Sequence, residues 1–326
     1  MASMFDDFSL EFEKPVKVLE SQIKELKEVD QKPDIDISSE IKALEKKVNK
    51  LIADIYSKLT PWERVQLSRH PNRPHSKDYI SYLIKDFHPL HGDRRFANDD
   101  AMITGFGYLD KKKVAVIAIE KGRKTKEKII HNFGMPQPEG YRKALRIMKL
   151  AAQFNIPVVV FVDTPGAYPG IGAEERGQAQ AIAENLAEMF DIAVPMISVV
   201  IGEGGSGGAL GIAVTDRVFM MEYSIYSVIS PESCASILWA DPTKAEIAAN
   251  ALQLGPNKAY ELGIIDGIID EPAGGAHRNY EETFENVKKV LSKTITQLQK
   301  LSADEIKQQR FERFRKLGNN TLEGLE

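Results

Sequence analysis

The sequence predicts an α/β protein, and three patterns support this prediction. Short apolar runs rich in β-branched residues, at 157–162 and 196–201, have the length and composition of buried strands. Stretches with a helical apolar period separate such runs from about residue 100 to 270. Glycine-containing turns follow both runs, so we expect two consecutive strand–turn–helix units whose turns line one cleft.

The first part of the chain has a helical period. One apolar stripe runs from Leu19 to Leu26, and Pro33 and Asp34 then interrupt the pattern. A second stripe, from Ile37 to Ile55, alternates steps of four and three residues with Lys and Glu between them. We therefore expect two helices in an antiparallel hairpin. This hairpin either packs on its own domain or grips another subunit.

Two shorter helices are predicted next. Thr60–Glu63 combines an N-cap, a proline at the first helical position and a capping-box glutamate, which is typical of a helix start. Ser76 is expected to cap a second helix that buries the apolar residues of Ile80–Phe87. His88 and His91 follow in a loop and resemble metal ligands, but a lone pair of loop histidines is more often structural, and we favour that role.

The remaining elements follow from periodicity and turn residues. The expected strands are 101–109, 113–119, 157–162, 196–201, 217–221, 226–229 and 264–269. The expected helices are 139–154, 174–190, a helix from Gly207 onward, 231–239, 242–252, 256–262, 280–299 and 303–316. This order predicts an N-terminal helical region at 1–95, an α/β core at 96–275 and C-terminal helices at 276–326.

Composition limits the possible functions. The net charge is −4, so no basic excess indicates binding to nucleic acid or to an anionic membrane. The only cysteine, Cys234, cannot form an internal disulfide, and no cysteine cluster offers a zinc site, so we expect no metal and a reducing compartment. The N-terminus lacks a long apolar core and the apolar runs are short, so neither a signal peptide nor a transmembrane segment is expected.

The glycine-rich stretch after 196–201 is the strongest functional signal. Six glycines lie between Gly202 and Gly211, and small apolar residues follow from Gly207 onward. The first N–H groups of a helix have no internal partner, and the helix dipole adds partial positive charge there. A strand that turns into a helix through glycines is therefore predicted to bind negative charge on an oxygen atom.

Nucleotide-binding motifs are one interpretation of this stretch. Gly202, Gly204 and Gly207 fit the dinucleotide pattern G-x-G-x-x-G, with Glu222 at the distance of a ribose-binding acid. Asp163–Gly166 is similar to a GTPase motif, but the chain has no G-x-x-x-x-G-K-[ST] loop, which argues against a P-loop nucleotidase.

Three other interpretations remain open at this point. The five residues Gly204–Gly208 fit the serine-hydrolase pattern G-x-S-x-G, with Ser206 as nucleophile and His277 and Asp266 as its partners. The stretch also fits an oxyanion hole made only of backbone N–H groups. A tight turn without a ligand is the simplest alternative.

A basic segment follows the second expected strand. Its cations are Lys121, Arg123, Lys124, Lys126 and Lys128. A run of this kind is usually a solvated loop and helix face. The functional alternative is a landing site for an acidic partner or for phosphates.

Seven motifs resemble the carboxyltransferase alpha subunit of the multi-subunit acetyl-CoA carboxylase of bacteria and plastids. They are Asn132–Pro136, Pro138–Arg146, Asp163–Gly170, Ala173–Gln178, Gly202–Leu210, Tyr226–Glu232 and Gly274–His277. The resemblance covers nearly the whole chain, and the glycine motif does not depart from the family pattern. It implies a crotonase-like fold of the ClpP/crotonase class, a spiral of ββα units, with an N-terminal helical extension and with 96–275 as the carboxyltransferase core.

The resemblance also implies an activity and partners. The expected enzyme is an α2β2 carboxyltransferase, active only with the beta subunit, that moves a carboxyl group from carboxybiotin to acetyl-CoA and makes malonyl-CoA for fatty acid synthesis. The beta subunit is expected to carry the zinc ribbon and most of the acetyl-CoA site. A separate biotin carboxylase, which alone uses ATP, charges the biotin carboxyl carrier protein. The implied location is the bacterial cytoplasm, or the plastid stroma of an alga or plant.

The resemblance assigns site residues as well. It implies that Gly207 and Gly208 donate N–H groups to the ureido oxygen of carboxybiotin, and one such donor is worth about 10²–10³ in rate, roughly 3–4 kcal/mol. The implied cofactor-binding residues beside them are Gly204, Gly205, Gly166, Ala167 and Tyr168. No side-chain nucleophile is required, so Ser206 need not act. The alternatives are a serine hydrolase using Ser206 and a subunit that only scaffolds its partner.

Overall fold

The computed structural model describes residues 8–30 and 37–318, and an eight-stranded mixed sheet is its centre. The strands are β1 (Ile84–Pro89), β2 (Met102–Leu109), β3 (Lys112–Ile119), β4 (Val158–Thr164), β5 (Met196–Gly205), β6 (Arg217–Met221), β7 (Ile225–Ser227) and β8 (Gly267–Ile269). The α-helices are α1 (Lys14–Asp30), α2 (Ser38–Tyr56), α3 (Pro61–Ser68), α4 (Ser76–Leu83), α5 (Thr125–Ile130), α6 (Pro138–Gln153), α7 (Ile171–Glu175), α8 (Gln178–Met189), α9 (Ser206–Ala213), α10 (Pro231–Trp239), α11 (Ala245–Leu252), α12 (Pro256–Glu261), α13 (Tyr280–Leu298) and α14 (Ala303–Arg315). Short 3₁₀ turns are η1 (Glu11–Glu13), η2 (Asn132–Gly134) and η3 (Pro242–Lys244).

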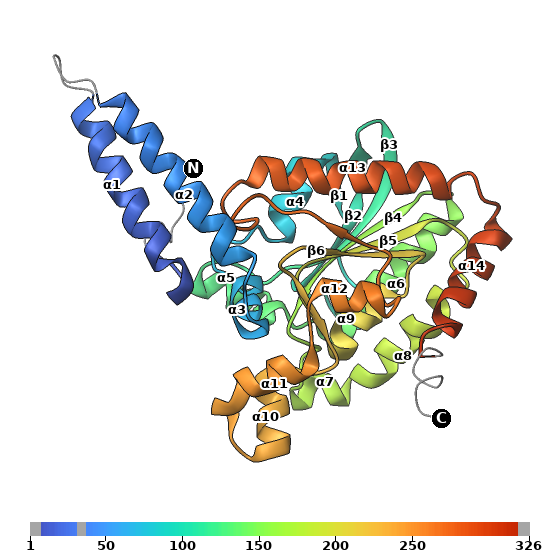
Figure 1. Cartoon of the computed structure of the whole chain (residues 1–326). Coiled ribbons are helices and arrows are strands. Elements are labelled where there is room, and N and C mark those ends of the chain that lie inside the picture. Colours follow the sequence, from blue (N-terminus) through green and yellow to red (C-terminus); the bar gives the residue numbers. More distant parts are fainter. Residues whose placement is uncertain (1–7, 31–36, 319–326) are drawn as a thin grey trace.

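The sheet is antiparallel at one end and parallel from β3 onward. Its order is β1-β2-β3-β4-β5-β6-β8, and β7 pairs with β5 beyond the end of β6. Side chains of a strand alternate between the two faces, so Val158 and Val160 pack against α6, α8 and α9, whereas Val159 and Phe161 face α4 and α13. Figure 1 shows helices on both faces of the sheet. The predicted α/β class is therefore confirmed.

The N-terminal helices α1 and α2 form the predicted hairpin, which projects from the body of the molecule (Figure 1). Pro33 and Asp34, the predicted interruption, lie outside the described residues. The base of the hairpin contacts the body through aromatic rings, because Tyr56 packs edge-on against Tyr223 with ring centroids 5.5 Å apart. Whether the hairpin also grips a second subunit stays a prediction.

The prediction of a helix that buries Ile80–Phe87 is wrong for the second half of this segment, which is a strand. α4 ends at Leu83, and Ile84 begins β1, which pairs with β2 from Ile84↔Leu109 onward. Pairing with a neighbouring strand overrides the local helical period in this segment. The cap prediction is also wrong, because His75 is the N-cap and the Ser76 hydroxyl instead donates to the Ile119 carbonyl at 2.6 Å.

The helix predicted at 174–190 is divided in two. α7 ends at Glu175 and α8 begins at Gln178. Gly177 between them has φ +80°, a left-handed conformation that an α-helix cannot contain. The strand predicted at 196–201 is longer than expected, since β5 continues through the first glycines to Gly205.

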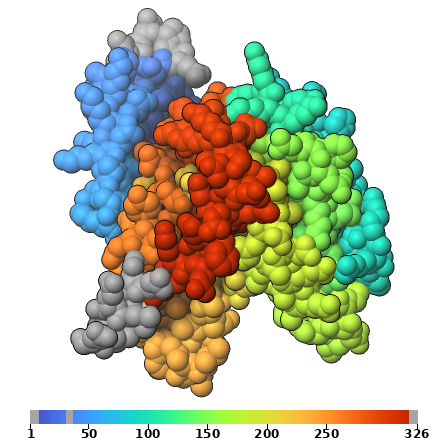
Figure 2. All heavy atoms as spheres, turned by 90° about the vertical axis from the view of Figure 1, so that its right-hand side faces the viewer, coloured from blue at the N-terminus to red at the C-terminus, as the bar shows by residue number. Residues whose placement is uncertain are grey.

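The C-terminal helices are confirmed, and α14 is anchored in the core. Figure 2 shows this segment in red against the parts of the chain coloured yellow and orange. Arg310 of α14 is fully buried and donates to both carboxylate oxygens of Asp216 and to the carbonyls of Met189, Ile192 and Val194. β1 lies before residue 95 yet belongs to the main sheet, and the division at 95 and 275 stays a prediction. No described helix is long and apolar enough to cross a bilayer.

Candidate active site

The two predicted strand-end turns lie side by side. β4 and β5 are parallel neighbours, and Thr164 pairs with Gly204 in their register. Because parallel strands end at the same edge of a sheet, the chain leaves both strands at one place. The Thr164 hydroxyl fixes the first turn, since it donates to the Gly166 carbonyl at 2.8 Å and accepts from the Gly166 N–H at 3.0 Å.

The backbones of these turns approach so closely that side chains do not fit between them. A Cβ at Gly205 would lie 2.2 Å from the Pro165 carbonyl oxygen. A Cβ at Gly208 would lie 2.4 Å from the Gly166 carbonyl carbon and 2.5 Å from the Ala167 nitrogen. Glycine is therefore required at 205 and 208 to close this contact.

Gly207 differs from Gly205 and Gly208, because a Cβ at this position would not overlap any backbone atom. The nearest atom to a Cβ at this position is a terminal carbon of Ile182, 3.7 Å away, and the residue is half-buried at the surface. Gly204 differs in the opposite sense: it is buried within β5, where a Cβ would meet the Tyr226 ring at 2.7 Å. A Cβ thus fits at Gly207 in ordinary van der Waals contact, whereas Gly204 supports the turn from below.

The first turn of α9 presents backbone N–H groups at this edge. Gly205 is the N-cap and no side chain of the described residues caps the helix. Ser206 has φ +50°, a left-handed conformation that is unusual for a residue with a side chain and that redirects the backbone into the helix. The N–H groups of Ser206, Gly207 and Gly208 belong to the first helical turn, which lacks internal acceptors and binds anionic oxygen.

Buried polar groups hold α9 in place. The Tyr141 hydroxyl of α6 donates to the Gly208 carbonyl at 3.1 Å. The Asn185 amide of α8 donates to the carbonyls of Tyr141, at 3.0 Å, and Gly211, at 2.9 Å. A Cβ at Gly211 would lie 2.9 Å from the Tyr141 ring, so this glycine lets α6 and α9 approach. The two helices α6 and α8 therefore fix the direction of the N–H groups of α9.

The loop after β4 forms a wall beside the turn. The Tyr168 N–H donates to the Pro136 carbonyl at 3.0 Å. The Gln178 amide donates to the carbonyls of Pro136 and Tyr168, each at 2.9 Å. Ala167 and Tyr168 are half-buried. The structure therefore brings the sequence-predicted residues Gly166–Tyr168 next to Gly205–Gly208.

An ion-pair network that the sequence did not predict lies below both turns. The Lys121 ammonium contacts the carboxylates of Asp163 in β4, at 2.8 Å, and Glu203 in β5, at 2.6 Å. Arg69 contacts Glu203 at 2.8 Å, and the Glu203 N–H donates to Asp163 at 3.0 Å. Burial alone would raise the pKa of Glu203, but Lys121 and Arg69 lower it to about 2.

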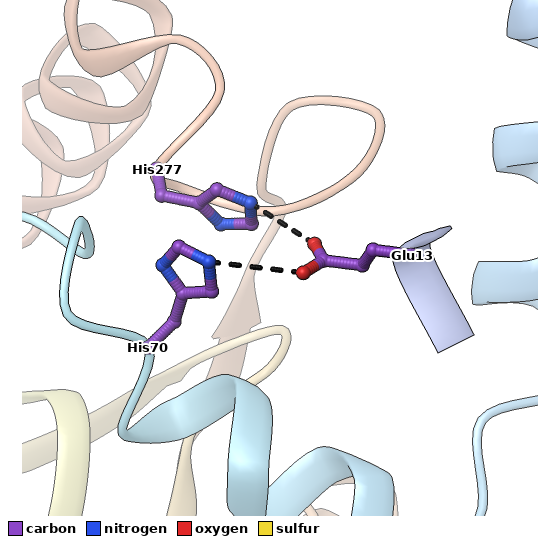
Figure 3. Close-up of side chains that lie close together, drawn as sticks. All are labelled: Glu13, His70 and His277. Atoms are coloured by element: carbon purple, nitrogen blue, oxygen red, sulfur yellow. Dashed lines mark ion pairs between the residues drawn. The ribbon is translucent and has the colours of Figure 1, made fainter. Parts of the chain in front are cut away.

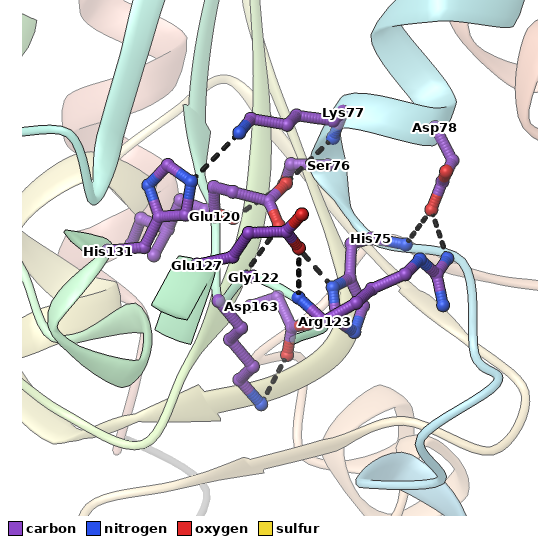
Figure 4. A network of polar contacts seen from close by, with 12 residues as sticks. His75, Ser76, Lys77, Asp78, Glu120, Gly122, Arg123, Glu127, His131 and Asp163 are labelled. Atoms are coloured by element: carbon purple, nitrogen blue, oxygen red, sulfur yellow. Dashed lines mark hydrogen bonds and ion pairs between the residues drawn. The ribbon is translucent and has the colours of Figure 1, made fainter. Parts of the chain in front are cut away.

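The ion pairs also show that two cations of the basic segment, Lys121 and Arg123, have acidic partners. Lys121 lies below the surface in these ion pairs, and Arg123 pairs with Asp78, so neither is a free surface cation. Lys124 and Lys126 are exposed, as expected for a solvated face. Figure 4 shows the adjoining contacts, in which Glu120 accepts the N–H groups of Lys77 and Gly122. A charge run in sequence gives no sign of which member is buried.

A group of side chains with metal-ligand chemistry lies elsewhere (Figure 3). Glu13 contacts His277 at 3.2 Å and His70 at 3.7 Å, and the two imidazole rings stack with centroids 3.9 Å apart. The His70 Nδ1 accepts the Asn72 N–H at 3.1 Å, which places the proton of the neutral ring on Nε2, the atom that faces Glu13.

A protonated Nε2 has no lone pair for a metal, so this arrangement is a tether in which His277 hydrogen-bonds to Glu13 and His70 stacks on His277. The Tyr56 hydroxyl also donates to Glu13 at 2.6 Å. Burial raises the pKa of Glu13, but hydrogen bonds from His277 and Tyr56 lower it to about 2. Burial, reinforced by repulsion from His277, lowers the pKa of His70 to about 3. The tether joins η1 to the segments that carry the two histidines.

The side chains required for a serine hydrolase are not brought together. His277 contacts Glu13 and His70. Asp266 pairs with Arg313 and accepts the Val218 N–H at 2.7 Å. Neither is a partner of Ser206 among the described contacts, so the geometry contradicts this triad.

The dinucleotide interpretation is also inconsistent with the geometry. Gly202 lies inside β5, where a Cβ would meet the Asp163 carboxylate at 2.5 Å, so it is not part of an exposed phosphate-binding turn. The Glu222 carboxylate accepts the Glu271 N–H at 3.1 Å. His88 and His91 join no metal-ligating group within residues 8–30 and 37–318.

Comparison with known proteins identifies relatives over almost the full length. Residues 9–318 match the family described as "Acetyl co-enzyme A carboxylase carboxyltransferase-like". Two similar proteins are named acetyl-coenzyme A carboxylase carboxyl transferase subunit alpha. The one from Methylococcus capsulatus is 54% identical over 305 residues, covering 94% of this chain and 95% of the relative. The one from Geobacter metallireducens is 52% identical over 314 residues, covering 96% and 98%.

Solved structures share the fold at low sequence identity. Transcarboxylase 12S has a TM-score of 0.56 at 22% identity, covering 70% of this chain and 44% of that chain. The beta subunit of geranyl-CoA carboxylase from P. aeruginosa has a TM-score of 0.56 at 14% identity, covering 76% and 45%. The chain thus spans less than half the length of these solved chains. Their similarity confirms the predicted crotonase-like α/β fold.

Proposed function

This chain belongs to the family of carboxyltransferase alpha subunits of acetyl-CoA carboxylase, and we propose from that premise that it transfers a carboxyl group from carboxybiotin to acetyl-CoA. The product is malonyl-CoA, which is used for fatty acid synthesis. Support comes from relatives that match both this chain and their own length almost completely. The observation that carries the proposal at residue level is the uncapped first turn of α9 in contact with the turn after β4.

The residues at this turn fit the ureido ring of carboxybiotin. Gly207 is half-buried and a Cβ there would meet no backbone atom within 4 Å, and Gly205 and Gly208 leave no side chain between the two backbones. When bound, carboxybiotin supplies a carboxyl group whose departure leaves negative charge on the ureido oxygen. We assign the N–H groups of Gly207 and Gly208 as donors to this oxygen. A preorganised donor of this kind is worth about 10²–10³ in rate, and the dipole of α9 adds to the same field.

The remaining predicted residues surround this position. We assign Gly166, Ala167 and Tyr168 to one wall of the pocket, because their loop is fixed beside the turn by Pro136 and Gln178. Gly205 allows the close approach of the turn after β4, and Gly204 supports the turn from within β5. The carboxylates of Asp163 and Glu203 are paired with Lys121 and Arg69, which weakens their repulsion of negative charge at the turn, although Arg69 also pairs with Glu232 at 2.6 Å.

We further propose that the active enzyme is an α2β2 assembly. In this proposal the beta subunit holds the zinc and most of the acetyl-CoA site. A biotin carboxyl carrier protein delivers carboxybiotin, and a separate biotin carboxylase uses ATP to charge it. The chain itself binds no metal, and the reaction takes place in the cytoplasm of a bacterium or in a plastid stroma.

The decisive experiment is carboxyltransfer between malonyl-CoA and free biocytin. The assay compares this chain alone, the beta subunit alone and a stoichiometric mixture that is verified as a complex. We expect activity only in the mixture, because the proposed donors lie in this chain and the acyl-CoA site in its partner. A verified complex without activity would overturn the proposal.

A further inference from the structure

A cavity of about 460 Å³ lies between α4, the β1–β2 edge of the sheet and α6, and it shares no lining residue with the glycine turn. Small-molecule sites usually occupy about 300–1,000 Å³. Much of its wall is apolar. The apolar lining residues are Ile80, Ile84, Phe87, Pro89, Met102 and Ile103. The cavity therefore has the size and lining of a binding site for an apolar body.

A buried cation faces this apolar space. Lys143 of α6 lines the cavity and is only 1% exposed. Its ammonium donates to Asn98 Oδ1 and to the Asp99 carbonyl, each at 2.7 Å, and no carboxylate of the described residues lies within 4.0 Å of it. An ammonium has three N–H groups, so one donor remains without an acceptor among the described residues, and the carboxylates of Asp99 and Asp100 attract the charge only from beyond ion-pair distance. Buried cations without a carboxylate partner are rare in proteins.

A second ammonium lies on the same wall. Lys77 donates to His131 Nε2 at 2.8 Å (Figure 4). The His131 Nδ1 donates to the Asp100 carbonyl at 2.6 Å, which fixes the ring as an acceptor toward Lys77. The one acidic side chain among the lining residues, Asp100, is exposed and accepts the Asn98 amide at 2.7 Å. The lining therefore has a net positive charge at its polar end.

We propose that this cavity binds an aliphatic carboxylate. Its chain lies against Ile80, Phe87 and Met102, and its carboxylate accepts the free N–H of Lys143 and a second hydrogen bond from Lys77. Charge complementarity favours this ligand class, because an apolar chain matches the wall and a single negative charge compensates the buried ammonium. The inference does not depend on the proposed carboxyltransfer, since no residue of the glycine turn contributes to it.

Calorimetric titration of the full-length chain with decanoate, decanol and decyltrimethylammonium tests the proposal, with each probe kept below its micellar concentration. All three probes have a ten-carbon aliphatic chain and differ in the head group. We expect saturable binding of decanoate and at least about tenfold weaker binding of the other two, because neither offers a carboxylate to the two ammonium groups. Equal affinity for decanoate and decanol, or no saturable binding, would overturn the assignment.

Two variants locate the site. Lys143→Met keeps the length of the side chain and removes the charge, and we expect it to weaken decanoate binding about tenfold or more. Lys149→Met is the matched control, because Lys149 is exposed on the same helix and pairs with Glu188. Ser81→Trp places a large ring at an exposed lining position and is expected to block binding even if Lys143→Met does not fold. Wild-type affinity in folded Ser81→Trp protein would contradict the proposal.

Discussion

A Cβ at Gly208 would lie 2.4 Å from the carbonyl carbon of Gly166, so α9 contacts the turn after β4 through backbone alone. This contact determines whether a substitution at the glycine turn lowers the stability of the chain or lowers only its activity. At 208 a new side chain would overlap backbone atoms of Gly166 and Ala167, which cannot move aside as a flexible side chain can. At 207 a Cβ would make only an ordinary van der Waals contact with Ile182, 3.7 Å away, so a side chain fits there without overlapping backbone.

We predict that two substitutions both reduce carboxyltransfer but differ in their effect on stability. Gly208→Ala should destabilise the chain by about 1–3 kcal/mol through overpacking, and carboxyltransfer should fall with it. Gly207→Val should fold with a wild-type melting temperature but lose carboxyltransfer, because its side chain occupies the proposed ring position. Thermal unfolding, assembly with the beta subunit and the biocytin assay separate the two effects. Full activity in an assembled Gly207→Val complex would favour a scaffold role for this chain.

Ser206 should be dispensable for the reaction. Its N–H belongs to the first turn of α9, but its hydroxyl has no role in the proposed chemistry, and its hydrolase partners His277 and Asp266 are engaged elsewhere. We expect Ser206→Ala to keep carboxyltransfer within about a factor of three, well below the loss of about 10²–10³ for a missing donor. A fluorophosphonate probe should leave Ser206 unlabelled. Specific labelling of this residue would reopen the hydrolase interpretation.

Which parts of the fold and the site could be predicted from the sequence depends on how far apart in the chain the interacting residues lie. Most of the strands and helices and the two turns follow from local periodicity and glycine placement, and the structure confirms these, apart from the helix at 174–190, which Gly177 divides. The strand at Ile84 was missed because its pairing with Leu109 overrides a helical pattern. The contacts of Lys121 with Asp163 and Glu203 could not be predicted, because they form only when β3, β4 and β5 end at one edge.

Lys121 should matter more than any other cation of the basic segment. Lys121→Met leaves the buried carboxylates of Asp163 and Glu203 without their shared partner, and breaking a buried ion pair costs about 3–5 kcal/mol. We expect that loss in urea unfolding, together with reduced carboxyltransfer, because both carboxylates directly precede the turns. Lys124→Met is the control, since Lys124 is exposed, and it should unfold like the wild type. Equal unfolding midpoints in the two variants would rule out this role.

The pH dependence of stability should reveal the same network. The pKa of Glu203 is about 2 in the folded chain, below its ordinary value of 4.5. The unfolded chain therefore binds more protons between these values, so the contribution of Glu203 to stability is complete above about pH 4.5 and is lost as the pH falls toward 2. We expect Glu203→Gln to flatten the fall of the urea midpoint across this window. Glu188→Gln, at an exposed carboxylate on α8, should keep the wild-type slope. An unchanged slope in Glu203→Gln would mean that Lys121 and Arg69 do not hold this carboxylate ionised.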